Sequence, residues 1–447
     1  MRPAPEPRWG RIGEAFLAVS ALATGALLVG TRLRPVTSLA LLLGASVALA
    51  AVALVPELRA GVRLVTVAIL AAPVLLLAVG LAPRGSHDIW SYAIYGRMVA
   101  HYHASPYRHI PAEYLHDPIY RLVGWRHTRS VYGPLFTALS AAFMAVAGTS
   151  TVLARLAFQG VAGVALIAIA VMLRRRGTSP VALALLVLNP VVVMGIVNGG
   201  HNDLLVGALV LAAAFRLQER RPVASGAFLA GAGLIKVSAL LAAMAAVVWA
   251  WRRWDRRAVV AMAVSIGSLV GVAYAAAGGM AAVTPLREAA NRWSHASIWS
   301  LGSHWMPRLA VSSLSTVVIG AVVLAVGRRW HVDPSPSLVI GAFLLAYLLA
   351  APYVMPWYVG WALPLLVIRP QSVLARVAFV YSALLFVSYN FGSSGGLLGF
   401  PLRWSALETQ VFAIAAIAVL AVWRRSAPSL SHPSVTMAGW TTTALSG

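Results

Sequence analysis

Long apolar runs, separated by short polar connections, follow one another along the whole chain. A run of about 20 apolar residues is the length that an α-helix needs to cross a bilayer. The runs lie at roughly residues 14–31, 36–56, 62–82, 151–173, 180–197, 203–217, 223–251, 257–278, 309–327, 337–352, 357–368, 372–390 and 406–423. The pattern predicts an all-α integral membrane protein with a bundle of about 12–14 transmembrane helices.

The composition narrows the class of protein further. Of the 447 residues, 60% are hydrophobic and 11% are charged, whereas a soluble domain carries about 25% charged residues. This excludes a cytoplasmic enzyme, a secreted domain and a disordered chain. The sequence contains no cysteine, which excludes disulfides and thiolate metal sites.

The chain is strongly basic, with a formal net charge of +23. In a soluble protein this charge would indicate a nucleic-acid partner. Here the arginines cluster at the ends of the apolar runs, which favours contact with anionic membrane lipids and cytoplasmic connections. We therefore expect membrane lipids as partners and no nucleic acid, in a multi-pass protein of the plasma membrane.

The positive charges also predict the topology. The N-terminus and the arginine pairs and triplets near residues 174, 220, 252, 328 and 424 are assigned to the cytoplasm. Segments 83–150 and 279–308 then form outer loops, and 133–148 is a juxtamembrane helix. Run 223–251 is either a hairpin that turns near Lys236 or one long tilted helix, and the hairpin satisfies the charges better. We expect 1–425 to be a single polytopic catalytic domain and 426–447 to be a disordered cytoplasmic tail.

Asp88 stands at the end of the third apolar run, followed by Ile89, Trp90 and Tyr92. A partly desolvated carboxylate has a raised pKa and is a better proton acceptor for a hydroxyl group. The alternative is that Asp88 caps a helix over 89–101. The two roles are compatible.

The first outer loop mixes aromatic residues with arginines, which can pack on sugar rings and bind phosphate. A belt of interfacial aromatic residues is the competing interpretation. The candidate binding residues in this region are His87, Tyr92, Arg97, Asp117, Arg126 and Tyr132.

Three later groups of polar residues are further candidates. His201, Asn202 and Asp203 follow Gly199-Gly200 in a turn between two runs, where they either form part of a site or cap a helix. Lys236 is the only lysine, and it either meets an anion such as a lipid phosphate or reaches to the interface. The second outer loop adds two arginines, Arg287 and Arg292. A Pro-Trp-Tyr sequence that contains Trp357 and Tyr358 begins a later span.

The chain has no Walker A, Rossmann, zincin or GxSxG motif, which disfavours nucleotide hydrolysis and triad chemistry. His201 and Asp203 could be drawn as metal ligands, but two ligands at that spacing are weak evidence. We therefore expect no cofactor.

Several motifs together resemble a known family. They are Asp88-Ile89-Trp90-Ser91-Tyr92, Gly96-Arg97, Pro106-Tyr107, Asp117-Pro118, Trp125-Arg126, Tyr132-Gly133-Pro134, His201-Asn202-Asp203, Gly233-Leu234-Ile235-Lys236 and Pro356-Trp357-Tyr358. The sequence resembles the GT-C glycosyltransferases, and more closely the actinobacterial polyprenol-phosphomannose-dependent α-1,6-mannosyltransferases that build lipomannan cores. The resemblance runs through most of 83–365.

The resemblance implies an inverting transfer of mannose at the extracytoplasmic face, from polyprenyl-phosphate mannose to a lipid-linked mannan or glycolipid acceptor. Asp88 would be the catalytic base. Lys236, Arg287 and Arg292 would hold the donor phosphate, and the other candidates would bind the acceptor or the sugar. His87 stands where many members of the class carry another acid, so the resemblance leaves a metal requirement open. Arabinose or glucose donors, a lipid transporter or flippase, and a scaffold without chemistry are the alternatives.

Overall fold

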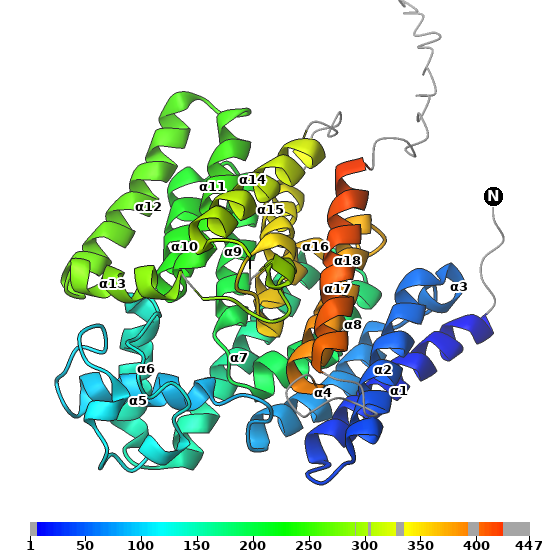
Figure 1. Cartoon of the computed structure of the whole chain (residues 1–447). Helices are drawn as coiled ribbons and strands as arrows, with labels where there is room; N and C mark the ends of the chain where they lie inside the picture. Colours follow the sequence, from blue (N-terminus) through cyan, green and yellow to red (C-terminus); the bar gives the residue numbers. More distant parts are fainter. Residues whose placement is uncertain (1–6, 291, 303–304, 328–334, 392–401, 423–447) are drawn as a thin grey trace, which may run out of the picture.

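The computed structural model describes residues 7–290, 292–302, 305–327, 335–391 and 402–422, and all regular elements among them are helices. Figure 1 shows their arrangement. The α-helices are α1 (Pro7–Val29), α2 (Pro35–Leu54), α3 (Pro56–Arg59), α4 (Leu64–Gly80), α5 (Asp88–Ala100), α6 (Pro134–Ala147), α7 (Thr151–Arg175), α8 (Pro180–Val187), α9 (Asp203–Gln218), α10 (Pro222–Ile235), α11 (Leu240–Trp251), α12 (Arg256–Ala276), α13 (Met280–Ala289), α14 (Arg308–Gly327), α15 (Pro336–Ala350), α16 (Val359–Leu366), α17 (Val373–Phe391) and α18 (Leu402–Val422).

The predicted all-α membrane protein is confirmed. Among the described residues, six helices are long and apolar enough to span a bilayer, or seven if the bent pair Pro180–Val187 and Val191–Asn198 forms one span. Six further apolar helices are shorter. The count of about 12–14 spans stays a prediction, because the six shorter apolar helices have 10–17 residues each.

Burial separates an inner from an outer set of helices. Every residue of α16 is buried, and Gly207 of α9 lies so close to α16 that a Cβ atom there would stand 2.1 Å from the carbonyl oxygen of Gly360. By contrast, only 11% of the spanning window of α12 and 17% of that of α14 are buried inside the protein. Apolar side chains that face outward in this way are typical of helices in contact with lipid.

Two expectations about local structure can be compared directly with the fold. The segment predicted as a juxtamembrane helix forms α6, which packs against α5. Run 223–251 is not one long helix, since α10 ends at Ile235 and Lys236 is extended (φ −147°, ψ 115°) before α11 begins. The break that the hairpin requires is therefore present. The predicted tail 426–447 lies outside the described residues.

Candidate active site

Asp88 is the first residue of α5, and its carboxylate faces the outer loop. The side chain does not cap the helix, as the alternative interpretation expected, because its Oδ1 accepts a hydrogen bond from Nε1 of Trp125 at 2.8 Å. His87 occupies the N-cap position and makes no capping bond. The backbone N–H of Asp88 donates to Oγ of Ser86 (3.2 Å). The carboxylate is therefore held toward the loop and not turned back onto its own helix.

The outer loop is ordered by a buried ion pair. Nε of Arg97 lies 2.6 Å from Oδ2 of Asp117, and the two side chains are 5% and 0% exposed. The hydroxyl of Tyr102 donates to the same carboxylate oxygen (3.0 Å). Arg97 and Asp117 were candidates for sugar binding, but here they contact each other and do not line the cavity described below. They fix the loop that carries Trp125.

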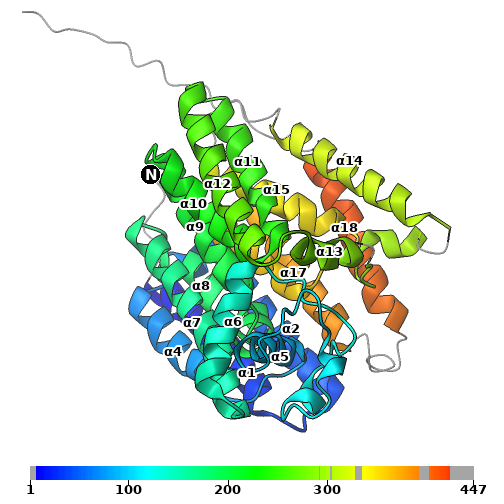
Figure 2. The same cartoon turned by 90° about the vertical axis from the view of Figure 1, so that its left-hand side faces the viewer.

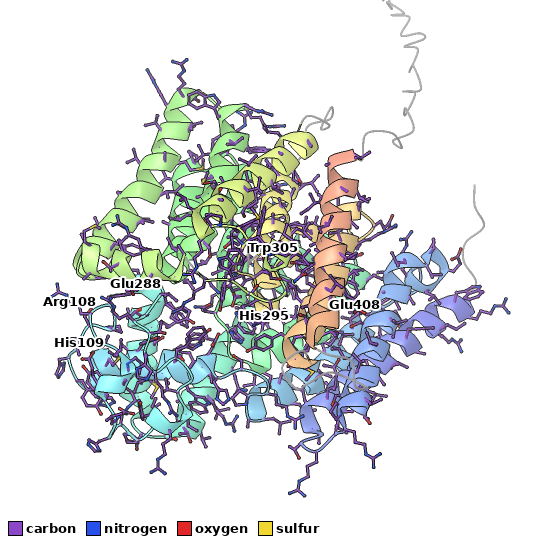
Figure 3. All side chains as sticks on the ribbon, viewed as in Figure 1. Arg108, His109, Glu288, His295, Trp305 and Glu408 are labelled. Carbon is purple, nitrogen blue, oxygen red and sulfur yellow. The ribbon has the colours of Figure 1, made fainter. Side chains whose placement is uncertain are left out.

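The two outer loops also contact each other. Nη2 of Arg129 lies 2.6 Å from Oε1 of Glu288, which is on α13. Figure 3 shows Glu288 at the border of the first loop, on the side where Arg108 and His109 lie. Nη2 of Arg292 donates to Oγ1 of Thr128 (3.4 Å). The second outer loop thus packs on the end of the first.

The turn before α9 brings His201 next to Asp88. Asn198 fastens this turn to the end of α4: its Nδ2 donates to the carbonyl of Ala78 (3.0 Å), and its Oδ1 accepts from the N–H of Arg84 (2.9 Å). Gly200 has φ +64°, and a Cβ there would meet Ile89 at 2.7 Å. The positive φ favours glycine at this position.

His201 contacts groups on three other elements. Its Nδ1 lies 3.7 Å from Oδ2 of Asp88 and 3.2 Å from the hydroxyl of Tyr92. Its ring stacks on Trp357, with centroids 3.8 Å apart and an interplanar angle of 15°. Burial, and then the positive charge of Lys236, lowers the pKa of His201 well below its usual value, which favours the neutral form of the imidazole next to Asp88.

Lys236 forms a buried ion pair with Asp203. Its Nζ lies 2.9 Å from Oδ1 of Asp203, which also accepts from Nε1 of Trp361 at 2.6 Å. The ammonium group stands 3.9 Å from the centroid of the Tyr358 ring, a favourable cation–π contact. Lys236 therefore pairs with an acid instead of reaching to the interface. Asp203 acts as its anion and does not cap α9, and Asn202, at the N-cap position, makes no capping bond.

The position of Lys236 depends on a close backbone contact. The N–H of Gly133 donates to the carbonyl of Ile235 (3.0 Å). A Cβ atom at residue 133 would stand 2.1 Å from the carbonyl oxygen of Leu234. This contact joins the start of α6 to the end of α10, so that the outer loop and Lys236 are fixed relative to each other.

A cavity of about 1180 Å³ joins these groups. One end is polar and is lined by Asp88, Trp125, Lys236 and Arg292. The rest is a mainly apolar trough, which we define as the space between α11, α14 and α15 and which Arg252 and Arg253 also line. Both α11 and α14 pack against α15, which lies between them in Figure 2. The apolar side chains of the trough include Leu241, Met244, Val248, Ile319, Val323, Leu324, Val339 and Phe343.

The trough is open on one side. Met244, Val248 and Leu324 line it and are 60%, 45% and 56% exposed. They belong to helices whose outer surfaces are apolar, so this opening faces the direction from which lipid approaches. A long apolar chain can therefore enter sideways from the bilayer while its polar head stays at the Asp88 end.

The electrostatics of the polar end favour proton transfer and anion binding. Burial raises the pKa of Asp88 above its ordinary value, while the hydrogen bond from Trp125 and the charge of Lys236 oppose that rise. The Arg292 guanidinium lies 4.6 Å from the centroid of the Trp125 ring. A carboxylate that can accept a proton thus stands in the same cavity as two cations, which attract a negatively charged group.

The remaining candidates lie in different places. Tyr132, Trp357 and Tyr358 line the cavity, whereas Tyr92 lies behind it and His201, Asn202 and Asp203 form its supporting layer. His87 and Arg287 are exposed and do not line the cavity. Arg126 donates to the carbonyls of Val123 and Arg121. Within the described residues, no three His, Asp or Glu side chains come together as a metal-binding group.

Two residues of the site were not singled out from the sequence. Trp125 stands beside Arg126 in one of the motifs. Arg126 was proposed as the site residue in place of Trp125, because guanidinium groups bind phosphate. Trp361 lies in an apolar helix, where an indole N–H gives no sign that it has a polar partner 158 residues away. In a sequence with few acidic residues, a tryptophan can indicate a hydrogen-bond partner for one of them, because its single N–H donor must find an acceptor when it is buried.

Comparisons with known proteins agree with one another. A family model described as the N-terminal domain of alpha-(1→6)-mannopyranosyltransferases matches residues 8–253. Alpha-(1→6)-mannopyranosyltransferase A of Corynebacterium glutamicum is 30% identical over 190 residues, which are 39% of this chain and 35% of that relative. The chain thus matches about a third of the length of this curated relative. No solved structure matches the chain.

Proposed function

Since the chain belongs to the alpha-(1→6)-mannopyranosyltransferase family, we propose that it is an inverting mannosyltransferase that uses polyprenyl-phosphate mannose. Its acceptor is a lipid-linked mannan or another glycolipid, and transfer takes place at the extracytoplasmic face of the plasma membrane, where the positive-inside rule puts Asp88. The product carries an α-1,6 linkage. The observation that supports this proposal best is the single cavity that joins a carboxylate and two cations to an apolar trough with an open side.

The trough supports a donor with an isoprenoid tail. Such a tail stays in hydrocarbon while it binds, since the exposed side chains Met244, Val248 and Leu324 continue the apolar surface of the bilayer into the protein. The donor phosphate then lies at the polar end, near Lys236 and Arg292. A water-soluble nucleotide sugar would leave the trough unused.

The chemistry follows from the groups at the polar end. Asp88 takes the proton from an acceptor hydroxyl as that oxygen attacks the anomeric carbon of the mannosyl phosphate. The new carbon–oxygen bond forms as the bond to the phosphate oxygen breaks, and the electron pair leaves with the polyprenyl phosphate. Lys236 and Arg292 stabilise the charge that develops on the leaving phosphate, which needs no proton. Attack from the opposite side inverts the β-mannosyl donor to an α product.

The residues behind the cavity keep these groups in position. Trp125 donates a hydrogen bond to one carboxylate oxygen of Asp88, and the His201 ring lies next to the other. Asp203 and Trp361 hold Lys236 through one shared oxygen. Tyr132, Trp357 and Tyr358 present aromatic surfaces to the cavity on which sugar rings can pack.

The proposal is tested with the purified full chain in lipid bilayers. Polyprenyl-phosphate mannose, arabinose and glucose are offered in separate reactions with a lipid-linked mannan acceptor, and the product linkage is determined. We expect transfer of mannose alone. Asp88→Asn should lower turnover about 10²–10⁴-fold, while Glu113→Gln, at an exposed acid of the same loop, keeps it. Near-normal turnover of Asp88→Asn would exclude Asp88 as the base, and lipid movement across the bilayer without a new linkage would indicate a transporter.

A further inference from the structure

The face of α5 that lines the cavity carries a buried serine. Asp88, Ser91 and Tyr95 all line the cavity, and their spacing of three and four residues puts them on one face of the helix. Asp88 accepts the hydrogen bond from Trp125, and the hydroxyl of Tyr95 donates to the carbonyl of Thr128 (2.7 Å). Ser91 is 1% exposed, and its Oγ has no hydrogen-bond partner among the described residues. The serine hydroxyl is therefore buried at the cavity wall without the kind of partner that its two neighbours have.

A serine inside a helix can bond to the carbonyl four residues earlier, but Ser91 does not. Ser140 of α6 makes such a bond, since its Oγ donates to the carbonyl of Phe136 (2.8 Å), and it is equally buried at 1% exposed. Other buried side chains also lack a partner, but within the described part of the chain Ser91 is the only one of them that lines the cavity. A buried hydroxyl without a partner is costly, so its place at the cavity wall points to a partner that the ligand supplies.

The position of Ser91 indicates which part of the ligand it meets. Residues three apart on a helix have Cβ atoms about 5–6 Å apart, so Ser91 lies beside the atoms that react at Asp88. On the donor, the anomeric carbon is bonded to the ring oxygen, which has no proton, and to the carbon that carries the 2-hydroxyl. On the acceptor of a 1,6 linkage, the carbon next to the attacking primary alcohol carries the ring oxygen and no hydroxyl. The 2-hydroxyl of the donor sugar is therefore the free hydroxyl closest to the reacting atoms.

We propose that Ser91 binds the 2-hydroxyl of the transferred sugar and thereby selects mannose over glucose. The inference rests on the proposed function and adds a residue that determines the sugar. Mannose and glucose differ only in the configuration at this carbon. A glucosyl donor in the same place directs its 2-hydroxyl elsewhere and leaves the buried serine unpaired, and a site built to bond a substrate hydroxyl discriminates strongly against such a ligand.

The test compares two donors in two proteins. Polyprenyl-phosphate mannose and its 2-deoxy analogue are offered with the same acceptor to the purified full chain and to Ser91→Ala in lipid bilayers, and kcat/KM is measured for each combination. The unmodified protein should prefer the mannose donor. Ser91→Ala should reduce that preference about tenfold or more, as expected when one hydrogen bond in a buried site is lost. The intrinsic reactivity of the 2-deoxy donor is the same with both proteins, so it cancels from the comparison.

Two controls make the result specific. The 6-deoxy donor lacks a hydroxyl that is remote from the anomeric carbon, so the preference for mannose over this donor should be the same in both proteins. Ser140→Ala removes an equally buried hydroxyl that does not line the cavity and should leave the preference over the 2-deoxy donor unchanged. Ser140→Ala loses its bond to Phe136 and should unfold at a lower temperature, whereas Ser91→Ala loses no bond within the protein and should not.

Three outcomes would overturn the proposal. The first is an unchanged preference in Ser91→Ala, and the second is an equal change for the 2-deoxy and the 6-deoxy donors. The third is a lower unfolding temperature of Ser91→Ala, because it would show that the hydroxyl has a partner within the protein. A failure of the proposed function is a different result, since the unmodified protein would then transfer no mannose from the polyprenyl-phosphate donor.

Discussion

The indole Nε1 of Trp125 donates a 2.8 Å hydrogen bond to Oδ1 of Asp88, 37 residues earlier in the chain. This bond connects the folded outer loop directly to the carboxylate that we propose as the base. It also makes the protonation of Asp88 depend on the position of the loop, because a hydrogen bond to the charged form stabilises that form.

Trp125→Phe should shift the pH dependence of transfer. The active form of Asp88 is the carboxylate, so the rate falls as the pH drops through its pKa. Burial already raises that pKa, and the Trp125 hydrogen bond lowers it. Without the bond, the pKa should rise. The acid limb of the pH profile of kcat/KM should then move to higher pH by about 1–2 units, since a hydrogen bond to a charged group contributes about 1.5–3 kcal/mol.

The control is Trp299→Phe, which removes an indole bond to the carbonyl of Ala350 outside the site (2.6 Å). Its acid limb should stay where it is in the unmodified protein. An unchanged limb in Trp125→Phe would mean that this tryptophan does not influence the proton-accepting group.

Arg292 and Arg287 should differ sharply, although both were candidates for phosphate binding. Arg292 lines the cavity and lies over Trp125, whereas Arg287 is exposed and does not line it. Arg292→Gln should raise the KM for the donor about 10-fold or more, as expected when a charged hydrogen bond to phosphate is lost. Arg287→Gln should change it less than about twofold. Initial rates over a range of donor concentrations measure both, and equal effects would contradict the assignment.

The Lys236–Asp203 pair should be needed both for stability and for donor binding, and a double variant should separate the two effects. Asp203→Asn leaves a buried ammonium group without its anion and should lower the free energy of unfolding by about 3–5 kcal/mol. Lys236→Met/Asp203→Leu removes both charges and should recover most of that stability. Thermal unfolding in detergent tests this, while the double variant should remain defective in transfer. Recovery of transfer would show that Lys236 has only a structural role.

The Arg97–Asp117 pair should contribute to stability more than any exposed pair of the outer loop. Asp117→Ala leaves Arg97 buried and unpaired, and we expect a loss of about 3–5 kcal/mol. Glu113→Ala, which breaks a pair whose side chains are 45% and 46% exposed, should cost less than about 1 kcal/mol. Thermal unfolding of the two variants compares them, and similar losses would show that the buried pair is not what holds the loop.

A large side chain in the trough should distinguish donors by tail length. Val248→Trp narrows the trough at a position that touches neither Asp88 nor Lys236. It should raise the KM for a long-chain donor severalfold while a short-chain analogue is used as before. Val264→Trp, on the exposed face of α12 outside the trough (61% exposed), is the control. If both donors respond equally to Val248→Trp, the tail does not lie in the trough.

The sequence was sufficient for the fold class and for the residues whose chemistry conflicts with their surroundings. Asp88 and Lys236 stand out because a charge in an apolar run must have a partner. The identity of that partner was not predictable: Lys236 meets Asp203, and Asp203 also meets Trp361, through contacts across helices that no local pattern encodes. For the same reason Arg97 and Asp117 were taken for ligand-binding residues, since their mutual contact exists only once the outer loop is folded.

Because the trough is open on one side, the concentration of a lipid substrate that matters to the protein is its concentration in the membrane. A molecule that slides in sideways never passes through water, so bulk molarity does not set its rate of arrival. What counts is its mole fraction in the surrounding membrane and its lateral diffusion there. If inert phospholipid is added while the total amount of substrate stays constant, the mole fraction of substrate in the membrane falls. Transfer should then slow as much as it does when the same mole fraction is reached by removing substrate.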